Sequence, residues 1–223
     1  MSQQQDHQYE FGNELPLNGV APGTNILVSG PSTTLARALA LKLVLVGNFT
    51  AEGMILISTD KGSQQVLKQC EDLCENLNRT RFGVIDCQKN SSDRGRVAER
   101  FKSVSSPGDL TGLGINFSAL YETFSQEGIE RIRTGVTSVP TLLMYHDLRT
   151  VFRFLHVFTG RVSTLGGVGV LYIDPTTQDD RTVSAIAQVC DGKITVREDE
   201  TGKPELRVQG LDTQPTEWTP FSL

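Results

Sequence analysis

The feature that most constrains the fold is an apolar run near the N-terminus that a tight turn interrupts. Asn25–Ser29 is a short apolar segment with the composition of a strand buried on both faces of a parallel sheet. The run breaks at Gly30. In the segment that follows, Leu35–Val46, the only polar side chains are Arg37 and Lys42, and a helix so apolar is itself buried. The stretch therefore predicts a buried strand, a tight loop and a buried helix.

A strand that runs through a glycine turn into a helix is the arrangement with which P-loop proteins hold phosphate, because backbone N–H groups and the helix dipole converge at the turn. That motif needs a second glycine five residues after the first, followed by Lys and Ser or Thr. This chain has Leu35, Ala36 and Arg37 at those positions, and no lysine in the loop. The hydroxyls of Thr33 and Thr34 either cap the helix or hold an anion weakly.

Strand and helix patterns alternate along the rest of the chain, which is typical of a doubly wound parallel sheet. The expected strands are residues 54–58, 82–87, 129–136 and 168–173, and the expected helices are residues 63–77, 117–124, 142–162 with a bend near 146–147, and 182–189. Residues 193–198 and 205–209 are expected to form a final hairpin. We expect one domain over residues 11–212, a flexible tail over residues 1–10 and a C-terminal tail over residues 213–223.

The polar middle of the chain, Ser91–Gly114, is predicted to be the longest loop, with Asn116 as the cap of the following helix. Within it, Ser105–Gly114 is rich in glycine and hydroxyl residues. Such a segment is either a plain surface loop or an anion-binding nest, in which several N–H groups converge.

The composition bounds the class of protein. With 21 Lys and Arg against 26 Asp and Glu, the net charge is −5, which makes general binding of nucleic acid backbones unlikely. The N-terminus is polar and no apolar run reaches transmembrane length, so no membrane association and a cytoplasmic location are expected.

Four cysteines, Cys70, Cys74, Cys87 and Cys190, have neither paired zinc spacing nor the density of a secreted scaffold. Cys70 and Cys74 lie one helical turn apart, and the alternatives are half of a metal site or two buried thiols. No second Cys/His pair follows at suitable spacing, so buried thiols in a reduced compartment are favoured. No metal site is expected.

The turn resembles that of the RecA superfamily, in its KaiC-like archaeal branch. The chain matches that pattern at Ser29-Gly30-Pro31 and Thr34-Leu35-Ala36 and is shorter between them, so that the part that wraps the phosphate is missing. Cys190-Asp191-Gly192-Lys193-Ile194 resembles the terminal hairpin of the family. The resemblance implies an α/β fold of three layers, the RecA/KaiC-like P-loop fold, with a mostly parallel central sheet and a C-terminal β-hairpin.

Three further segments, Val84–Cys87, Val151–His156 and Glu217–Phe221, resemble small haloarchaeal relatives of the KaiC-like proteins. This likeness covers nearly the whole chain. It implies an archaeal, halophilic source, with which the mild acidic bias agrees, and it implies no defined activity.

The family pattern also locates the residues that an ATPase would use. It has an aspartate for the magnesium shell where this chain has Thr137, and a general-base carboxylate near the position of Asp60. Asp174 follows the next strand, where the family carries a polar sensor residue; otherwise it forms a turn with Pro175. With Gly30, Ser32, Thr33 and Thr34, these three residues are the candidates for weak nucleotide or anion binding.

A second candidate surface lies on the helix expected over residues 142–162. Arg149, Arg153 and His156 fall at helical spacing along one side. This side is either a solvated face or an arginine stripe that grips an acidic partner or the nucleotide of an adjacent subunit. His146 and Asp147 have no third metal ligand near them in the sequence.

The sequence therefore predicts a RecA/KaiC-like regulatory or protein-interaction module, with degenerate Walker motifs and no catalytic residues, in archaeal signal transduction. Its partner would be another protein or a second copy, and no cofactor is expected. The first alternative is a weak ATP-binding switch or slow ATPase with magnesium, which would use Thr33 and Thr34 with a borrowed cation. The second is a DNA recombination accessory, against which the net charge counts.

Overall fold

The computed structural model describes residues 8–87 and 100–223. The strand β1, Asn25–Ser29, is buried along its whole length. A short loop leads to the helix α1, Ala36–Leu45, most of whose side chains are buried. The predicted buried strand, tight loop and buried helix are confirmed.

The strands form one mixed sheet in the order β4-β3-β2-β5-β6-β1-β7-β8-β9. All pairings from β4 to β7 are parallel, and β8 and β9 add antiparallel pairs at one edge. The remaining strands are β2 (Gly53–Ser58), β3 (Phe82–Asp86), β4 (Phe101–Ser103), β5 (Ile132–Val136), β6 (Val168–Ile173), β7 (Gly192–Glu198), β8 (Pro204–Gln209) and β9 (Thr219–Pro220). The β7–β8 hairpin is the predicted one.

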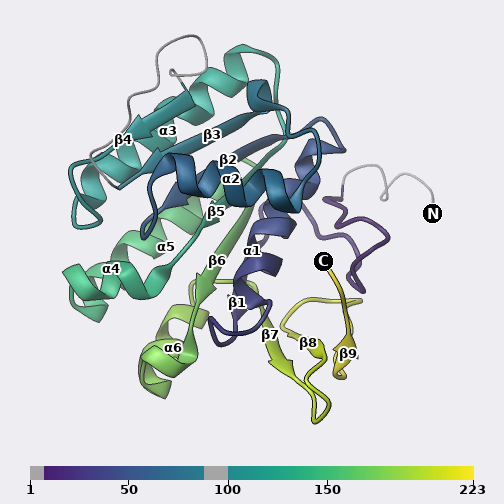
Figure 1. Cartoon of the computed structure of the whole chain (residues 1–223). Helices are drawn as coiled ribbons and strands as arrows, with labels where there is room; N and C mark the ends of the chain where they lie inside the picture. The colour runs from purple at the N-terminus through teal and green to yellow at the C-terminus, as the bar shows by residue number, and fades with distance from the viewer. Residues whose placement is uncertain (1–7, 88–99) are drawn as a thin grey trace.

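Helices cover both faces of this sheet (Figure 1). The bounds are α2 (Ser63–Leu73), α3 (Leu110–Gln126), α4 (Val139–Tyr145), α5 (Leu148–Thr164) and α6 (Asp180–Ala187), with 3₁₀ turns at Val46–Asn48, Arg79–Arg81 and Pro175–Thr177. One apolar cluster joins α1 and α2 to the sheet, and a second joins α3, α5 and α6 to its other face. The predicted α/β architecture of three layers, with a mostly parallel sheet, is confirmed.

The middle of the chain differs from the prediction. The helix α3 begins at Leu110, where Asp109 caps it by accepting a hydrogen bond from the Gly112 N–H at 2.8 Å. Asn116 therefore lies inside the helix, where its side chain donates to the Ser103 carbonyl at 3.2 Å. The helix extends further because its buried side chains follow a helical spacing from the first turn: Leu113, Phe117, Leu120, Tyr121 and Phe124.

The predicted loop Ser91–Gly114 is correspondingly wrong in part. Its residues 91–99 lie outside the described residues, residues 101–103 form β4, and residues 110–114 are the first turns of α3. Of the proposed nest over residues 105–114, the first five residues are loop. The helix α2 ends at Leu73, before the predicted Leu77, because Cys74 adopts an extended conformation.

Both terminal segments lie against the sheet. Tyr9 and Phe11 are buried, and Tyr9 forms an antiparallel bridge with Val20. At the other end, the Trp218 ring lies under the guanidinium groups of Arg197 and Arg207, at 3.9 and 4.8 Å from the ring centroid. The division of the chain at residues 10 and 212 stays a prediction.

The N-terminal segment is held by a buried ionic network at the amino end of β5. The Arg133 side chain is fully buried and donates to Glu52 at 2.5 Å, to the Leu43 carbonyl at 3.0 Å and to the Glu10 carbonyl at 2.6 Å. Arg131 also pairs with Glu52, at 3.1 Å. Because the network joins β5, α1 and the segment before β1, it attaches the segment around Glu10 to the core.

Within residues 8–87 and 100–223, no helix combines the length and the apolar character that crossing a bilayer requires.

Candidate functional site

The carboxyl ends of the parallel strands meet at one edge of the sheet. The register pairs Ser29 of β1 with Ile173 of β6, and Ser58 of β2 with Asp86 of β3. Polar residues follow directly after the ends of β2, β5 and β6: Thr59, Asp60, Thr137, Ser138 and Asp174. In open α/β sheets ligands bind outside this edge, so the candidate site lies here.

The loop after β1 is fastened to the end of β6. The Gly30 N–H donates to the Ile173 carbonyl at 3.3 Å, and the Ser32 N–H donates to the Asp174 carboxylate at 2.8 Å. The Thr34 hydroxyl donates to the Pro31 carbonyl at 2.7 Å and accepts from the Ala36 N–H at 3.3 Å, so it is engaged within its own turn.

Asp174 is almost fully buried. Its carboxylate binds Thr176 as well as Ser32 in the loop. Its other carboxylate oxygen accepts hydrogen bonds from the N–H and hydroxyl of Thr176, at 2.9 and 2.6 Å. Burial raises the pKa of Asp174, but the hydrogen bonds from Thr176 and Ser32 outweigh it, and the pKa lies below the ordinary 3.8. The carboxylate is therefore charged at neutral pH and joins two turns.

A charged network lies between β2, β5 and α1. Arg37, in the first turn of α1, donates to both carboxylate oxygens of Asp60, at 2.5 and 3.0 Å. The Thr137 hydroxyl donates to the same carboxylate at 2.9 Å and accepts from the Thr59 N–H at 3.3 Å. We call Arg37, Asp60 and Thr137 the Arg37 network. It brings together two predicted site residues with one that the sequence analysis did not propose.

Residues 23–196 match the model of DUF7504, described as a family of unknown function. The chain belongs to the DUF7504 family. No curated protein matches its sequence.

The structure of this DUF7504 protein is similar to that of a KaiC-like protein from the hyperthermophilic archaeon Pyrococcus horikoshii OT3. The TM-score is 0.67 at 11% sequence identity, and the match covers 97% of this chain and 95% of the other. At this identity the likeness shows the fold alone, which is the KaiC-like RecA fold that the sequence predicted.

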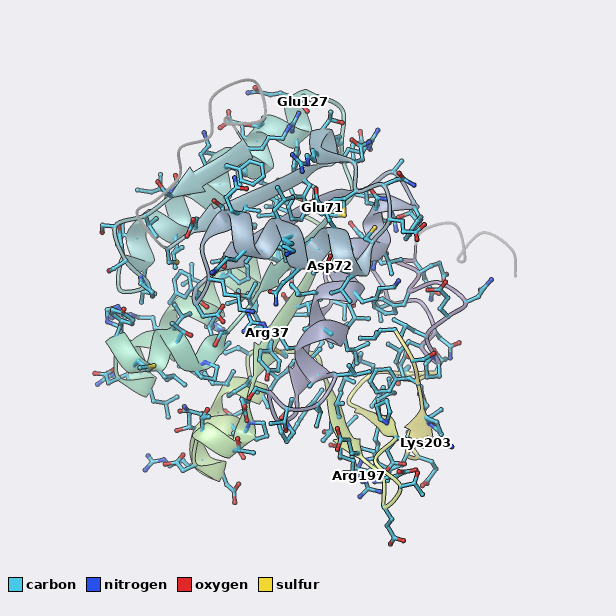
Figure 2. The ribbon with its side chains drawn as sticks, in the orientation of Figure 1. Arg37, Glu71, Asp72, Glu127, Arg197 and Lys203 are labelled. Carbon is cyan, nitrogen blue, oxygen red and sulfur yellow. The ribbon has the colours of Figure 1, made fainter. Side chains whose placement is uncertain are left out.

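Two hollows flank the Arg37 network of the DUF7504 chain. One, of about 460 Å³, lies between α1 and α2 and is lined by Ser32, Thr34, Arg37, Lys61 and Asp72, among others. Figure 2 labels Arg37 and Asp72 on the face of the sheet that α1 and α2 cover. The other hollow, of about 420 Å³, lies on the far side of Asp60 and is lined by Cys87, Thr141 and Tyr145, among others.

Burial and neighbouring charges shift the pKa values of the titrating groups around these hollows. Burial lowers the pKa of Lys61, and the neighbouring Arg37 lowers it further. Burial also raises the pKa of the Cys87 thiol to about 12, with Asp86 and Asp60 adding to the effect. Because the thiolate is the nucleophilic form, Cys87 is not set up for nucleophilic chemistry at neutral pH.

The remaining predicted residues are placed as follows. Thr33 is exposed on the loop. Arg149, Arg153 and His156 lie on the exposed side of α5 and are not among the residues of the Arg37 network, so their role as a partner face stays a prediction. The His146 ring nitrogen lies 2.9 Å from the Gly108 carbonyl oxygen.

Neither Arg37 nor Arg133 was predicted to have a role. The sequence does contain a feature that could have indicated a role for Arg37. It is one of two polar residues in an otherwise apolar helix, where a charged side chain needs a partner. Arg133 had a similar feature, as a charged residue within the strand expected over residues 129–136. Their partners Asp60 and Glu52 are distant in sequence, so only the fold identifies them.

Gly30 of this DUF7504 chain has a packing role that the structure makes testable. A Cβ atom there would lie 2.7 Å from the Ala36 Cβ and 2.8 Å from the Val196 carbonyl oxygen. Since neither neighbour is the end of a flexible side chain, we expect Gly30→Ala to lower the free energy of unfolding by about 1–3 kcal/mol. Urea denaturation of the wild type and of Gly30→Ala measures the difference in the free energy of unfolding.

Gly160, inside α5, is the matched control, because a Cβ there meets nothing within 4 Å. Gly160→Ala is expected to raise the free energy of unfolding by about 0.4–1 kcal/mol, since alanine restricts the unfolded chain. Equal effects of the two substitutions would show that close packing does not require glycine at position 30.

Proposed function

We propose that this DUF7504 protein is a RecA/KaiC-like domain with degenerate Walker motifs that does not hydrolyse ATP and acts as a regulatory or protein-interaction module, in archaeal signal transduction. The observation that carries the proposal is the Arg37 network, in which Arg37, Asp60 and Thr137 bind one another at the edge where nucleotide chemistry would take place. Its partner would be another protein.

Phosphoryl transfer depends on positioning and on charge stabilisation by a lysine, a magnesium ion and a residue that orients the nucleophile. The loop from Gly30 to Arg37 contains no lysine. Thr137 offers magnesium no charge, and its hydroxyl already donates to Asp60. Asp60, the candidate base, accepts hydrogen bonds from the Arg37 guanidinium on both carboxylate oxygens.

The test is calorimetric titration of the full chain with ATP and with ADP, in magnesium and high salt, together with an assay of phosphate release. We expect no saturable heat and no release above buffer, because the loop that would wrap the triphosphate carries no lysine. Magnesium-dependent ATP turnover that Asp60→Asn abolishes would overturn the proposal.

One observation favours a second candidate, a weak nucleotide-binding switch. The 460 Å³ hollow places two cations, Arg37 and Lys61, beside the hydroxyls of Ser32 and Thr34, and such groups together bind phosphate. Saturable ATP heat that disappears in the Thr33→Ala/Thr34→Ala double variant, and persists in the exposed Thr216→Ala control, would support this candidate without hydrolysis.

A further inference from the structure

An apolar groove runs between α3 and α5, on the face of the sheet opposite α1 and α2. It has a volume of about 270 Å³. Its walls come from the first turns of α3 and the second half of α5: Leu110, Thr111, Gly114, Ile115, Phe117, Ser118, Phe154, Val157, Phe158 and Arg161. We call this the α3–α5 groove.

The groove leaves large apolar side chains in contact with solvent. Ile115 is 63% exposed and Val157 is 64% exposed, one on each wall. Beneath them the Phe117 and Phe158 rings pack with centroids 5.0 Å apart and close the floor. Two opposed apolar side chains over a packed aromatic floor are a feature of surfaces that a partner covers.

The charge on the α5 wall of the groove has one sign. The helix α5 carries Arg149, Arg153 and Arg161 and no Asp or Glu, in a chain of net charge −5. Within the described part of the chain, no side-chain hydrogen bond or ion pair engages the guanidinium group of Arg153 or Arg161. Arg161 lines the groove itself, and Arg153 precedes Val157 by one helical turn. The wall that α3 contributes, residues 110–118, has no charged residue.

We infer that the α3–α5 groove binds an acidic amphipathic helix of a protein partner. The inference rests on the proposed function as an interaction module and names the chemistry of its partner. Apolar side chains of that helix, at i, i+3 or i+4, and i+7, lie between Ile115 and Val157. Carboxylates on its flank pair with Arg153 and Arg161, to which bidentate hydrogen bonds are open.

The groove's length fits this occupant. The wall from Leu110 to Ser118 rises about 1.5 Å per residue, or about 12 Å in all, which is roughly two turns of a bound helix. The two helices lie side by side, since the Tyr121 hydroxyl of α3 donates to the Leu165 carbonyl just after α5 at 3.0 Å. A helix laid along them would contact both walls.

The experiment selects peptides of about 16 residues, or roughly four helical turns, from a random displayed library on the full chain. The Arg153→Glu/Arg161→Glu double variant serves for counter-selection. We expect the enriched peptides to be acidic with helical spacing of apolar residues. Fluorescence anisotropy then measures their Kd, which Arg153→Glu/Arg161→Glu or Val157→Ser should raise about tenfold or more.

Lys68→Glu, which changes an exposed cation of α2 on the opposite face, is the matched control and should leave the Kd unchanged. Circular dichroism checks that all variants are folded. Three results would overturn the inference: no enrichment of acidic peptides, binding that the groove variants do not weaken, or wild-type dimers that the double variant abolishes, which would assign the groove to a second copy.

Co-sedimentation with anionic phospholipid vesicles completes the test. Vesicle binding that the double variant abolishes, without peptide enrichment, would assign the basic side of α5 to a membrane and overturn the inference. None of these measurements involves the Arg37 network, so ATP turnover could refute the proposed function while peptide binding to the groove stands, and the reverse.

Discussion

Replacing Glu52 with alanine is expected to lower the free energy of unfolding by about 3–5 kcal/mol, since removing one partner of a buried pair leaves a charge without compensation. Glu52 is 3% exposed and Arg133 is fully buried. Burial lowers the pKa of the Arg133 guanidinium, and Glu52 opposes that shift. Without Glu52, the Leu43 and Glu10 carbonyls still accept from Arg133 but bring no negative charge. Thermal and urea unfolding measure the loss.

The double variant Glu52→Leu/Arg133→Met separates charge from packing. Because apolar residues of similar size often replace a buried ion pair with little loss, it should recover much of the stability that Glu52→Ala loses. The exposed Glu130→Ala serves as control, with an expected change within about 0.5 kcal/mol. A Glu52→Ala loss no larger than that of the control would show that the network contributes little to the fold.

The second large effect is expected at Asp174. Its carboxylate accepts from the Ser32 N–H and from both donors of Thr176, and hydrogen bonds to a charged group contribute about 1.5–3 kcal/mol each. Because the bonds share one carboxylate and do not add in full, we expect Asp174→Ala to lower the free energy of unfolding by about 2–4 kcal/mol. Hydrogen exchange should also quicken at the Ser32 amide, which loses its acceptor.

Asp174 also predicts a pH dependence. Its pKa in the folded chain lies below the ordinary 3.8, so the folded state favours the charged form. The stabilisation is therefore complete above the pKa of the unfolded chain and is lost as the pH falls through the folded pKa. Asp147, Asp179 and Asp199, whose pKa values are lowered by backbone and side-chain hydrogen bonds, contribute with the same sign.

The measurement is unfolding between pH 7 and pH 2 for the wild type and for Asp174→Asn. The asparagine variant should be less stable at pH 7 and should lose less stability between pH 4 and pH 2, since its amide does not titrate. Parallel curves for the two proteins would contradict the lowered pKa of Asp174.

The sequence predicted those elements whose burial is uniform. β1 and α1 are recognisable because nearly every side chain faces the core, and the β7–β8 hairpin because its strands flank a turn. The start of α3 was missed because glycines at 112 and 114 suggested a loop, whereas the capping Asp109 and the buried Leu113 decide for a helix.

The candidate site was predictable only residue by residue. Asp60, Thr137 and Asp174 were located because the resemblance to the KaiC-like proteins places functional residues at these positions. Their contacts were not located: Asp60 forms an ion pair with Arg37 of α1, which is distant in the sequence. Such a contact depends on how α1 lies over β2 and β5, which no local pattern encodes.

The two margins of the sheet bear on how the protein behaves at high concentration. β4 has three residues and β9 has two, so each margin has few backbone groups open to an added strand. Short edge strands protect a sheet from the edge-to-edge pairing that leads to aggregation. The same brevity makes recruitment of a partner by strand addition unfavourable, and leaves the side chains of the covering helices as the means of selecting one.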